Sequence, residues 1–402
     1  MLTRARQGYE MDQMQQDEVE RPTVFLHSSW RTSSTWLWSC FRRSESTVAY
    51  VEIFHETLAS LESSQIAKLT PGSWPSGHPA GAPYLLEFLP LLTPQGGVAR
   101  YRASMAIESF VPAAGLAGDL SREEVEYVDM LIGHARRLDR QPVLADTRTL
   151  GRLGALKRQF GGIHILLHRN LLHQWASYSR LAYEGNTFFL LMIKNIIEFG
   201  QHDPFLRDLR QLYPLGPPDC RSENYFMAFL LLHLYLYTHA FAHASMAIDV
   251  TRLARNADYR RKIQRRIRKQ TTIELDLDTV RENFEFSLLP YPDLAELREN
   301  LVASMQSIRS FQNAGKSEVR RAHLLIEGLI EEMERHNFYA SGVTSILCRP
   351  GGLLDVRSER DRLVGEQEAL RNQQESLVRE RSELVAEQDA FRKERDALAP
   401  QV

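Results

Sequence analysis

The sequence has few cysteines, and the three it has are far apart. Cys40, Cys220 and Cys348 are odd in number, and none belongs to a CxxC pair. A disulfide framework and a cysteine-based zinc site both need paired cysteines, so both are excluded. We therefore expect a protein of a reducing compartment and place it in the cytoplasm.

The chain also lacks an excess of either charge. Its 402 residues include 49 Lys and Arg against 51 Asp and Glu, and 43% of them are hydrophobic. This balance is typical of a globular protein and excludes wholesale disorder and a polybasic coat for nucleic acid. The basic cluster at 260–269 is interpreted as a solvated helix face, although a polyanion site would have the same composition.

Residues 1–20 lack the apolar core of a signal peptide and are interpreted as a loose leader. One long run lacks charge: residues 225–248 contain no Asp, Glu, Lys or Arg and are numerous enough to span a bilayer. Histidines are costly at membrane depth, and this run has His233, His239 and His243, so we predict a buried core helix and no membrane span. No carboxylate or cysteine stands beside these histidines, which favours core residues over metal ligands.

A CRPGG break near Pro350 marks a change of composition, and a charged helix is predicted after it. An apolar residue recurs there every seventh position, at Leu363, Leu370, Leu377, Leu384, Phe391 and Leu398. The second seam position of each heptad holds Gln or Arg, so a two-stranded coiled coil would bury polar groups in every layer. A solvated helix and a loosely paired homodimer both fit this pattern.

Between these ends, short apolar runs alternate with helical patterns, which is typical of parallel βαβ units. Strands are predicted in PTVFLHSS, TVAYVEIF, QPVLADT, IHILLHR and SMAIDV. Helices are predicted after Thr35, after Thr149, around Gln174, over 223–243 and over roughly 318–336. The predicted domains are a flexible leader (1–20), an α/β domain with a central parallel sheet (21–345) and the charged heptad helix (353–399).

A hydroxyl-rich turn joins the first predicted strand to the helix after it. The turn runs from Trp30 through Arg31, Thr32, Ser33, Ser34 and Thr35 to Trp36. Loop amides and the first amides of the helix converge at such a junction, and the helix dipole makes it suited to a phosphate or sulfate. Arg31 adds a fixed positive charge. Helix capping alone would also explain the hydroxyls.

A second polar pair follows the strand IHILLH. Arg169 stands at the strand end, and Ser177 comes eight residues later on the predicted helix. The guanidinium of Arg169 can bind a phosphate through two hydrogen bonds, and Ser177 is two helical turns on and can reach the same anion. Alternatively, the two side chains are a surface Arg and a helix Ser that never meet.

Together the two elements resemble the sulfotransferases over about residues 20–60 and 143–180. The turn is similar to the 5′-phosphosulfate loop of that family, commonly written PRSGTTWL or PKSGTTW, and Arg169 with Ser177 is similar to its 3′-phosphate pair. Trp30 stands where the family has Pro, and Ser33 stands where it has Gly. If that position needs a positive φ, Ser33 carries strain of about 1 kcal/mol.

The resemblance implies a three-layer α/β sandwich with a P-loop-like parallel sheet. It implies transfer of a sulfuryl group from 3′-phosphoadenosine 5′-phosphosulfate (PAPS) to an acceptor hydroxyl or amine, with no metal required. Arg31, the amides of residues 32–35 and the hydroxyls of Ser34 and Thr35 would face the departing phosphate. Arg169 and Ser177 would hold the 3′-phosphate.

Candidates for the base lie at the end of the strand AYVEIF, which would end beside the turn. In several members of the family a Glu at the end of the corresponding strand looks like the base, and Glu52 matches that placement. His55 is the second candidate because imidazole titrates near neutrality. Glu56 is the third titratable group. Asp146, Arg148 and Arg152 end another predicted strand and receive no role.

Two other functions remain open. A P-loop nucleotide kinase or NTPase of similar fold would need magnesium-ATP, although GxxxxGK[ST] is missing from the turn. A non-catalytic scaffold would dimerise through the heptad helix and keep a relic sulfotransferase domain. For the sulfotransferase, the Pro- and Gly-rich stretch 70–97 predicts a substrate-covering loop whose aromatic residues favour a carbohydrate or glycolipid acceptor.

Overall fold

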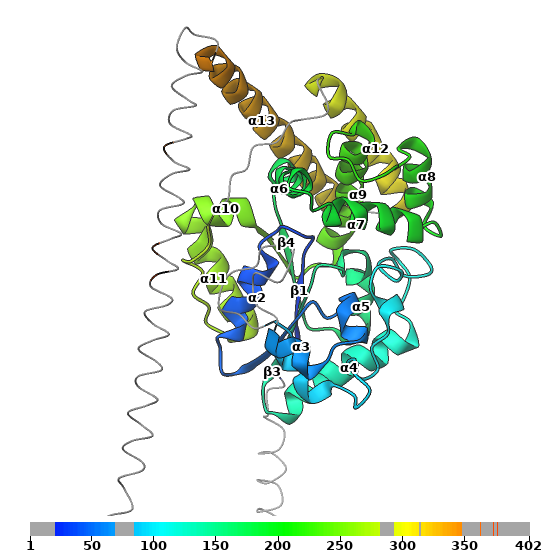
Figure 1. Cartoon of the computed structure of the whole chain (residues 1–402), viewed down its shortest axis with the longest axis vertical. Helices are drawn as coiled ribbons and strands as arrows, with labels where there is room; N and C mark the ends of the chain where they lie inside the picture. The colour runs from blue at the N-terminus through cyan, green and yellow to red at the C-terminus, as the bar shows by residue number, and fades with distance from the viewer. Residues whose placement is uncertain are drawn as a thin grey trace, which may run out of the picture. The chain divides into compact units, whose positions relative to one another are not determined.

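The computed structural model describes residues 21–68, 84–281, 293–312 and 315–347, with three isolated positions at Arg362, Gln373 and Ser376 (Figure 1). The predicted leader, residues 70–83 of the predicted substrate-covering loop, Cys348 and all but these three positions of the heptad helix lie outside the described residues. The chain divides into two compact units, Met1–Met333 and Glu334–Val402. The candidate site lies in the first.

Five parallel strands form the central sheet, in the order β2-β3-β1-β4-β5. They are β1 (Val24–His27), β2 (Thr47–Val51), β3 (Gln141–Asp146), β4 (Ile163–His168) and β5 (Met246–Asp249). Each lies within one of the predicted apolar runs. Parallel strands read as nearly continuous apolar runs because helices cover both of their faces, and this prediction is confirmed.

Strand β1 lies in the middle of the sheet, with β3 on one side and β4 on the other. In the parallel register, its last residue, His27, lies opposite Asp146 of β3 and Leu166 of β4. The chain continues from β1 towards the β2 edge and later passes from β3 across β1 to β4, so the strand order reverses at β1. Ligands of open α/β sheets bind at the carboxyl ends of strands at such a reversal.

Helices cover both sides of the sheet, with α2 and α11 on one side and α4 and α5 on the other (Figure 1). In chain order the helices are α2 (Ser34–Arg42), α3 (Ser63–Lys68), α4 (Arg122–Arg137), α5 (Leu153–Phe160), α6 (Leu171–Tyr183), α7 (Phe188–Phe199), α8 (Pro204–Leu212), α9 (Glu223–His243), α10 (Val250–Arg255), α11 (Ala257–Thr271), α12 (Leu294–Gln312) and α13 (Lys316–Leu347). Short 3-10 turns are η1 (Glu56–Ala59), η3 (Leu86–Leu91), η4 (Ala103–Met105) and η5 (Leu150–Arg152). The predicted end of the last helix near residue 336 is wrong: α13 continues to Leu347, since no proline interrupts it before Pro350.

Helix α9 contains the uncharged run. Every side chain from Tyr225 to Phe241 is buried. The helix is long and apolar enough to cross a membrane, but 94% of its most apolar window is buried inside the protein. It is apolar on all sides because α5, α6, α7, α8, α12 and β4 pack around it. The run is therefore a core helix of this unit, as its histidines predict.

The buried position of α9 predicts the effect of shortening its side chains. Leu230 is fully buried in the core, whereas Leu212 at the end of α8 is 71% exposed. Leu230→Ala should lower the free energy of unfolding in urea by about 2–5 kcal/mol, because it leaves a cavity. Leu212→Ala should change it by no more than about 0.5 kcal/mol. Equal effects of the two substitutions would contradict the buried position of α9.

Candidate functional site

The turn after β1 has the backbone geometry of an anion cradle. Arg31 has a φ of 63° and Ser33 a φ of 59°, whereas Thr32 between them is not among the residues with positive φ. Left-handed residues in a turn can direct successive amides towards one side. The first backbone bond of α2 runs from Leu37 N–H to the Ser33 carbonyl at 3.2 Å, so the three preceding amides come before the helical ladder. They stand at the positive end of the helix dipole.

The hydroxyls of the turn differ in their surroundings. Thr32 is fully buried, and its hydroxyl donates to the Ser29 carbonyl at 2.6 Å. This bond closes the turn and leaves Thr32 to offer only its amide. Ser33, Ser34 and Thr35 are partly exposed, and Ser33 makes no side-chain capping bond. The helix-capping interpretation is therefore wrong for Ser33, the residue at the capping position.

Arg31, Arg169 and Ser177 are brought together beside this turn. Arg31 Nε donates to Ser177 Oγ at 2.7 Å, and Arg169 Nη1 donates to the Arg31 carbonyl at 3.2 Å. The adjacency of β1 and β4 explains the meeting, because the turn follows β1 and Arg169 follows β4. Ser177 is fully buried, so an anion reaching its hydroxyl must share it with Arg31 or displace Arg31.

A network of neutral side chains supports the turn from the core. Gln174 Nε2 donates to Ser29 Oγ and to the Trp30 carbonyl, each at 2.9 Å. Ser29 Oγ lies 2.8 Å from His233 Nε2, and His233 Nδ1 lies 2.7 Å from the Phe229 carbonyl. A carbonyl can only accept, so Nδ1 carries the proton and Ser29 donates to Nε2. Burial lowers the pKa of His233 to about 4, which keeps the network neutral at physiological pH.

The ends of β2 and β3 carry a buried ionic cluster around Arg148. Arg148, 1% exposed, binds Glu52 Oε2 through Nη1 at 2.5 Å and Glu56 Oε2 through Nη2 at 2.9 Å. Thr147 Oγ1 donates to Glu52 Oε2 at 3.0 Å. Asp146 accepts from the amide of Phe54 at 2.6 Å and from the amide of Arg148. A single guanidinium thus faces three carboxyl groups.

Burial and these neighbouring charges together determine the protonation of Glu52. Burial raises the pKa of Glu52 to about 7, and the Arg148 guanidinium opposes that rise. Asp146 and Glu56 add to the rise because they are like charges. Burial raises the pKa of Asp146 as well. Glu52 can therefore exchange a proton near neutrality, as a general base must.

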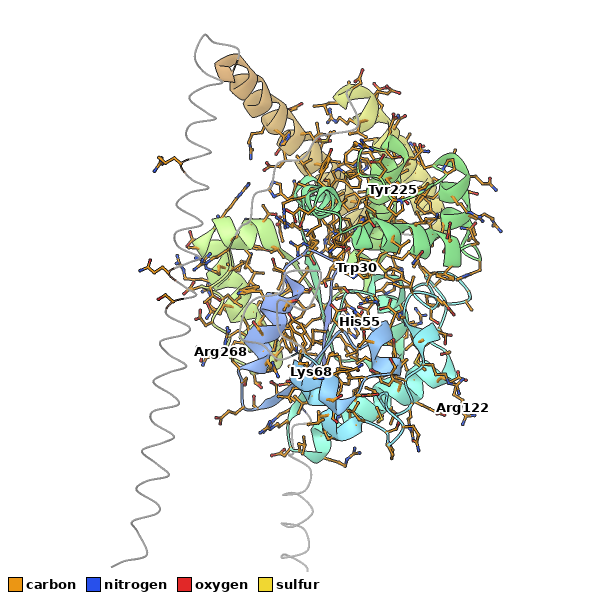
Figure 2. All side chains as sticks on the ribbon, viewed as in Figure 1. Trp30, His55, Lys68, Arg122, Tyr225 and Arg268 are labelled. Carbon is orange, nitrogen blue, oxygen red and sulfur yellow. The ribbon has the colours of Figure 1, made fainter. Side chains whose placement is uncertain are left out.

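Trp30 connects the anion cradle to the ionic cluster. The Arg148 guanidinium lies 5.7 Å from the Trp30 ring, which also stacks on Phe110 with a centroid distance of 6.3 Å. Trp30 is in the interior of the unit, at the start of the turn into α2 (Figure 2). The residue that departs from the sulfotransferase pattern thus has a packing role here.

His55 and Arg152 are engaged in structural contacts. His55 Nδ1 accepts from the Thr57 amide at 3.2 Å, which caps η1, and the same nitrogen lies 3.4 Å from Glu56 Oε2. Arg152 is fully buried and binds Glu124 at 2.6 Å and the carbonyls of Met105 and Ala106. Glu52 is therefore the predicted base with the more suitable environment, and Arg152 holds the fold together.

Two aromatic residues of the predicted substrate-covering loop lie in the core. Tyr84 and Phe88 are buried, and Tyr84 stacks on Trp38 with a centroid distance of 5.5 Å. The expectation that these rings offer faces to a sugar is wrong, because Phe88 packs on Tyr50 of β2 and Tyr84 packs on Trp38 of α2. Trp74 lies outside the described residues. The sequence analysis did not single out Tyr84. Burial raises the pKa of its hydroxyl, and a hydrogen bond with Thr35 opposes that rise.

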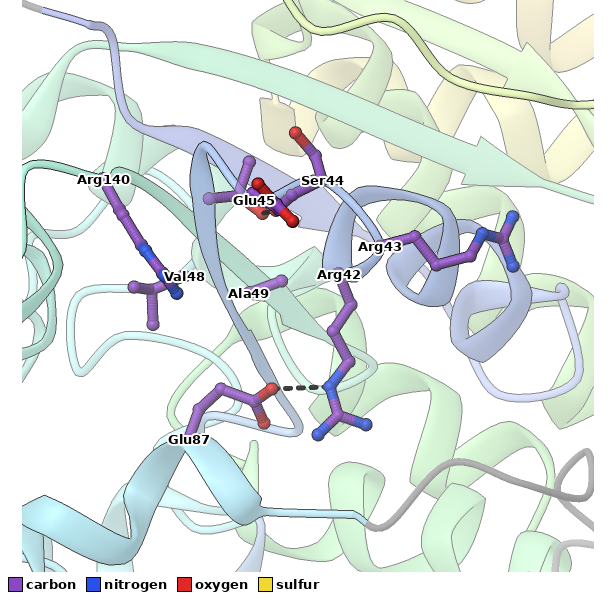
Figure 3. A pocket seen from close by; sticks show the side chains of 9 residues that line it. Arg42, Arg43, Ser44, Glu45, Val48, Ala49, Glu87 and Arg140 are labelled. Carbon is purple, nitrogen blue, oxygen red and sulfur yellow. Dashed lines mark hydrogen bonds and ion pairs between the residues drawn. The ribbon is translucent and has the colours of Figure 1, made fainter.

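A pocket of about 250 Å³ lies at the opposite edge of the sheet from the turn (Figure 3). Arg42, Glu87 and Arg140 line it at the amino ends of β2 and β3, and Arg42 Nε binds Glu87 Oε1 at 2.6 Å. It shares none of the predicted site residues. Within the described ranges, no group of three His, Cys, Asp or Glu side chains could hold a metal ion.

No family model, curated protein or solved structure matches the chain.

The left-handed backbone of Ser33 predicts a stabilising substitution. Ser33→Gly should raise the free energy of unfolding by up to about 1 kcal/mol, because glycine adopts this φ without strain. Ser34→Gly is the matched control, since Ser34 is the first residue of α2 and glycine there should cost about 0.5–1 kcal/mol. Urea unfolding of both variants measures the difference, and a destabilised Ser33→Gly would contradict the strain.

The raised pKa of Glu52 predicts a pH dependence of stability. The folded protein holds this proton more tightly than the unfolded chain, so the contribution is complete below about pH 4.5 and is lost as the pH rises through about 7. Relative to Glu52→Gln, which stays neutral, the wild-type protein should lose stability across this window, on the order of 3 kcal/mol. Urea unfolding at several pH values tests this.

The exposed Glu62→Gln serves as the control, and its stability should follow the wild-type pH curve. Parallel curves for the wild-type protein and Glu52→Gln would show that folding does not change the pKa of Glu52.

Proposed function

We propose that this protein is a sulfotransferase that moves the sulfuryl group of PAPS to an acceptor hydroxyl. The observation that carries this proposal is the convergence of Arg31, Arg169 and Ser177 beside the anion cradle. The sequence resemblance expects these residues to hold the two phosphates of one nucleotide, and they come from two crossovers that meet only in the folded sheet. Glu52, whose raised pKa suits it to accept a proton, lies at the same edge of the sheet.

The roles of the residues follow from their charges and donors. Arg31 and the amides of residues 32–35 can neutralise charge that develops on the departing phosphate. Arg169 can bind the second phosphate through its guanidinium, and Ser177 can donate its hydroxyl there once Arg31 releases it. Glu52 can accept the acceptor's proton, with Arg148 and Thr147 orienting its carboxylate.

The geometry favours this proposal over a kinase or NTPase. A magnesium-nucleotide site would need free carboxylate oxygens beside the cradle and a lysine in the turn. Asp146 ends the strand next to β1, but its two carboxylate oxygens already accept from the amides of Phe54 and Arg148. Residues 28–35 contain no lysine. The non-catalytic scaffold would need no titrating carboxyl group at this edge, so Glu52 also weighs against it.

The acceptor class and the oligomeric state are proposed from sequence patterns. We propose a carbohydrate or glycolipid acceptor; Trp74 and the glycines around it, which favour this class, lie outside the described residues. A homodimer through the heptad helix stays a prediction for the same reason. A panel of acceptors with a radiolabelled sulfate donor would identify the class.

Binding of adenosine 3′,5′-bisphosphate, the nucleotide product, tests the proposed function. Calorimetry without magnesium should show binding, and Arg169→Ala should weaken it about 10- to 100-fold because a charge-assisted hydrogen bond is lost. Ser177→Ala should have a smaller effect, since its hydroxyl is neutral. Arg180→Ala on the same helix is the control, because Arg180 pairs with Glu184 on the surface.

Magnesium-ATP is the competing ligand in this experiment. Binding of magnesium-ATP with no heat from adenosine 3′,5′-bisphosphate would overturn the sulfotransferase proposal in favour of the kinase. Heat from neither nucleotide would favour the scaffold.

A further inference from the structure

Tyr101 lies beside the ionic cluster, and neither the sequence motifs nor the proposed mechanism uses it. It comes between η3 and η4 and is 7% exposed. Its ring lies 5.1 Å from that of Tyr127, centroid to centroid. The neighbouring turn η4 packs on η1, the turn that begins with Glu56. Arg152 holds η4 in place because its guanidinium donates to the carbonyls of Met105 and Ala106.

The hydroxyl of Tyr101 is buried and makes no hydrogen bond with any described residue. A buried donor without a partner costs about 1–3 kcal/mol, and native proteins rarely keep one without a reason. The adjacent Tyr127 shows the ordinary arrangement, since its hydroxyl donates to the Ile53 carbonyl at 2.7 Å. In this respect Tyr101 differs from Tyr127, the residue that its ring contacts.

The charges near this hydroxyl belong to the candidate site. Burial first, and then Asp146, Arg148 and Glu56, act on the pKa of Tyr101. The net effect raises that pKa, so the hydroxyl stays protonated and remains a donor at physiological pH. The Glu56 side chain is 40% exposed, so the cluster is open to solvent on that side. A ligand that binds at the cluster could therefore accept a hydrogen bond from the Tyr101 hydroxyl.

We propose that Tyr101 is an acceptor-binding residue whose hydroxyl donates a hydrogen bond to a second oxygen of the acceptor. This assignment rests on the proposed sulfotransferase function. The reacting hydroxyl of the acceptor gives its proton to Glu52, and a neighbouring oxygen of the same molecule satisfies Tyr101. The acceptor is therefore a polyol with adjacent oxygens, such as a sugar ring, and a simple alcohol would leave the Tyr101 hydroxyl unsatisfied.

Tyr101→Phe removes the hydroxyl and keeps the ring, and Tyr127→Phe is the matched control. Because the Tyr101 hydroxyl makes no hydrogen bond with the part of the chain that the structure describes, Tyr101→Phe should leave the unfolding midpoint unchanged or raise it. Tyr127→Phe should lower it, since the Ile53 carbonyl loses its donor. A clear destabilisation by Tyr101→Phe would show that its hydroxyl has a structural partner and would overturn the assignment.

Kinetics supply the second measurement, with radiolabelled PAPS as donor and methyl β-galactoside as the polyol probe. Tyr101→Phe should bind adenosine 3′,5′-bisphosphate as the wild-type protein does and raise the KM for the glycoside about tenfold, with a smaller change in kcat. Tyr127→Phe should keep the wild-type KM.

The failures of this experiment are distinguishable. No binding of adenosine 3′,5′-bisphosphate by the wild-type protein would overturn the proposed function and this assignment together. Nucleotide binding without transfer to the glycoside would overturn the polyol class. Transfer with an unchanged KM in Tyr101→Phe would overturn the role of Tyr101 alone.

Discussion

The buried guanidinium of Arg148 is the interaction on which the candidate site depends. It links Glu52 at the end of β2 with Glu56 on η1, and its own amide binds Asp146 at the end of β3. Removal of one member of a buried ion pair costs about 3–5 kcal/mol, because the remaining charge loses its partner. The carboxyl ends of β2 and β3 are therefore held together by charge. Burial raises the pKa of Glu52, Arg148 opposes the rise, and Asp146 and Glu56 add to it.

The anion cradle is held in a different way. Ser29, Gln174 and His233 support it through hydrogen bonds between neutral groups, and burial keeps His233 neutral. This support consists of neutral groups and adds no carboxylate of its own beside Arg31. Trp30 contacts both systems, because its ring lies beside the Arg148 guanidinium and its carbonyl accepts from Gln174. This separation suits a site that must attract an anion at one end and remove a proton at the other.

The sequence was sufficient to predict the strands and the turn. Continuous apolar runs identify strands covered on both faces, and the position of Arg31 and Arg169 directly after two of them places both at one edge. The distinction between Arg148 and Arg152 could not be predicted. They stand four residues apart, yet Arg148 serves the cluster and Arg152 binds Glu124 in the core, 28 residues earlier in the chain. Such pairings are set by tertiary packing, which no local pattern records.

Local irregularities gather at the carboxyl edge of the sheet. Arg31, Ser33 and Glu52 all adopt positive φ without being glycine. The first two belong to the anion cradle, and Glu52 belongs to the ionic cluster. Tyr101, whose buried hydroxyl bonds no described residue, packs on Tyr127, which donates to the Ile53 carbonyl beside Glu52. Each of these features lowers the free energy of unfolding, and such features persist only where the surrounding packing enforces them. Of the four other non-glycine residues with positive φ in the described ranges, Asp139 and Thr272 follow helix ends, where left-handed residues are ordinary. Leu85 precedes η3, and Arg100 precedes Tyr101. Strain concentrated at one edge, beside a titratable carboxyl group and an anion cradle, marks that edge as the part of the molecule shaped for a ligand and not for stability alone.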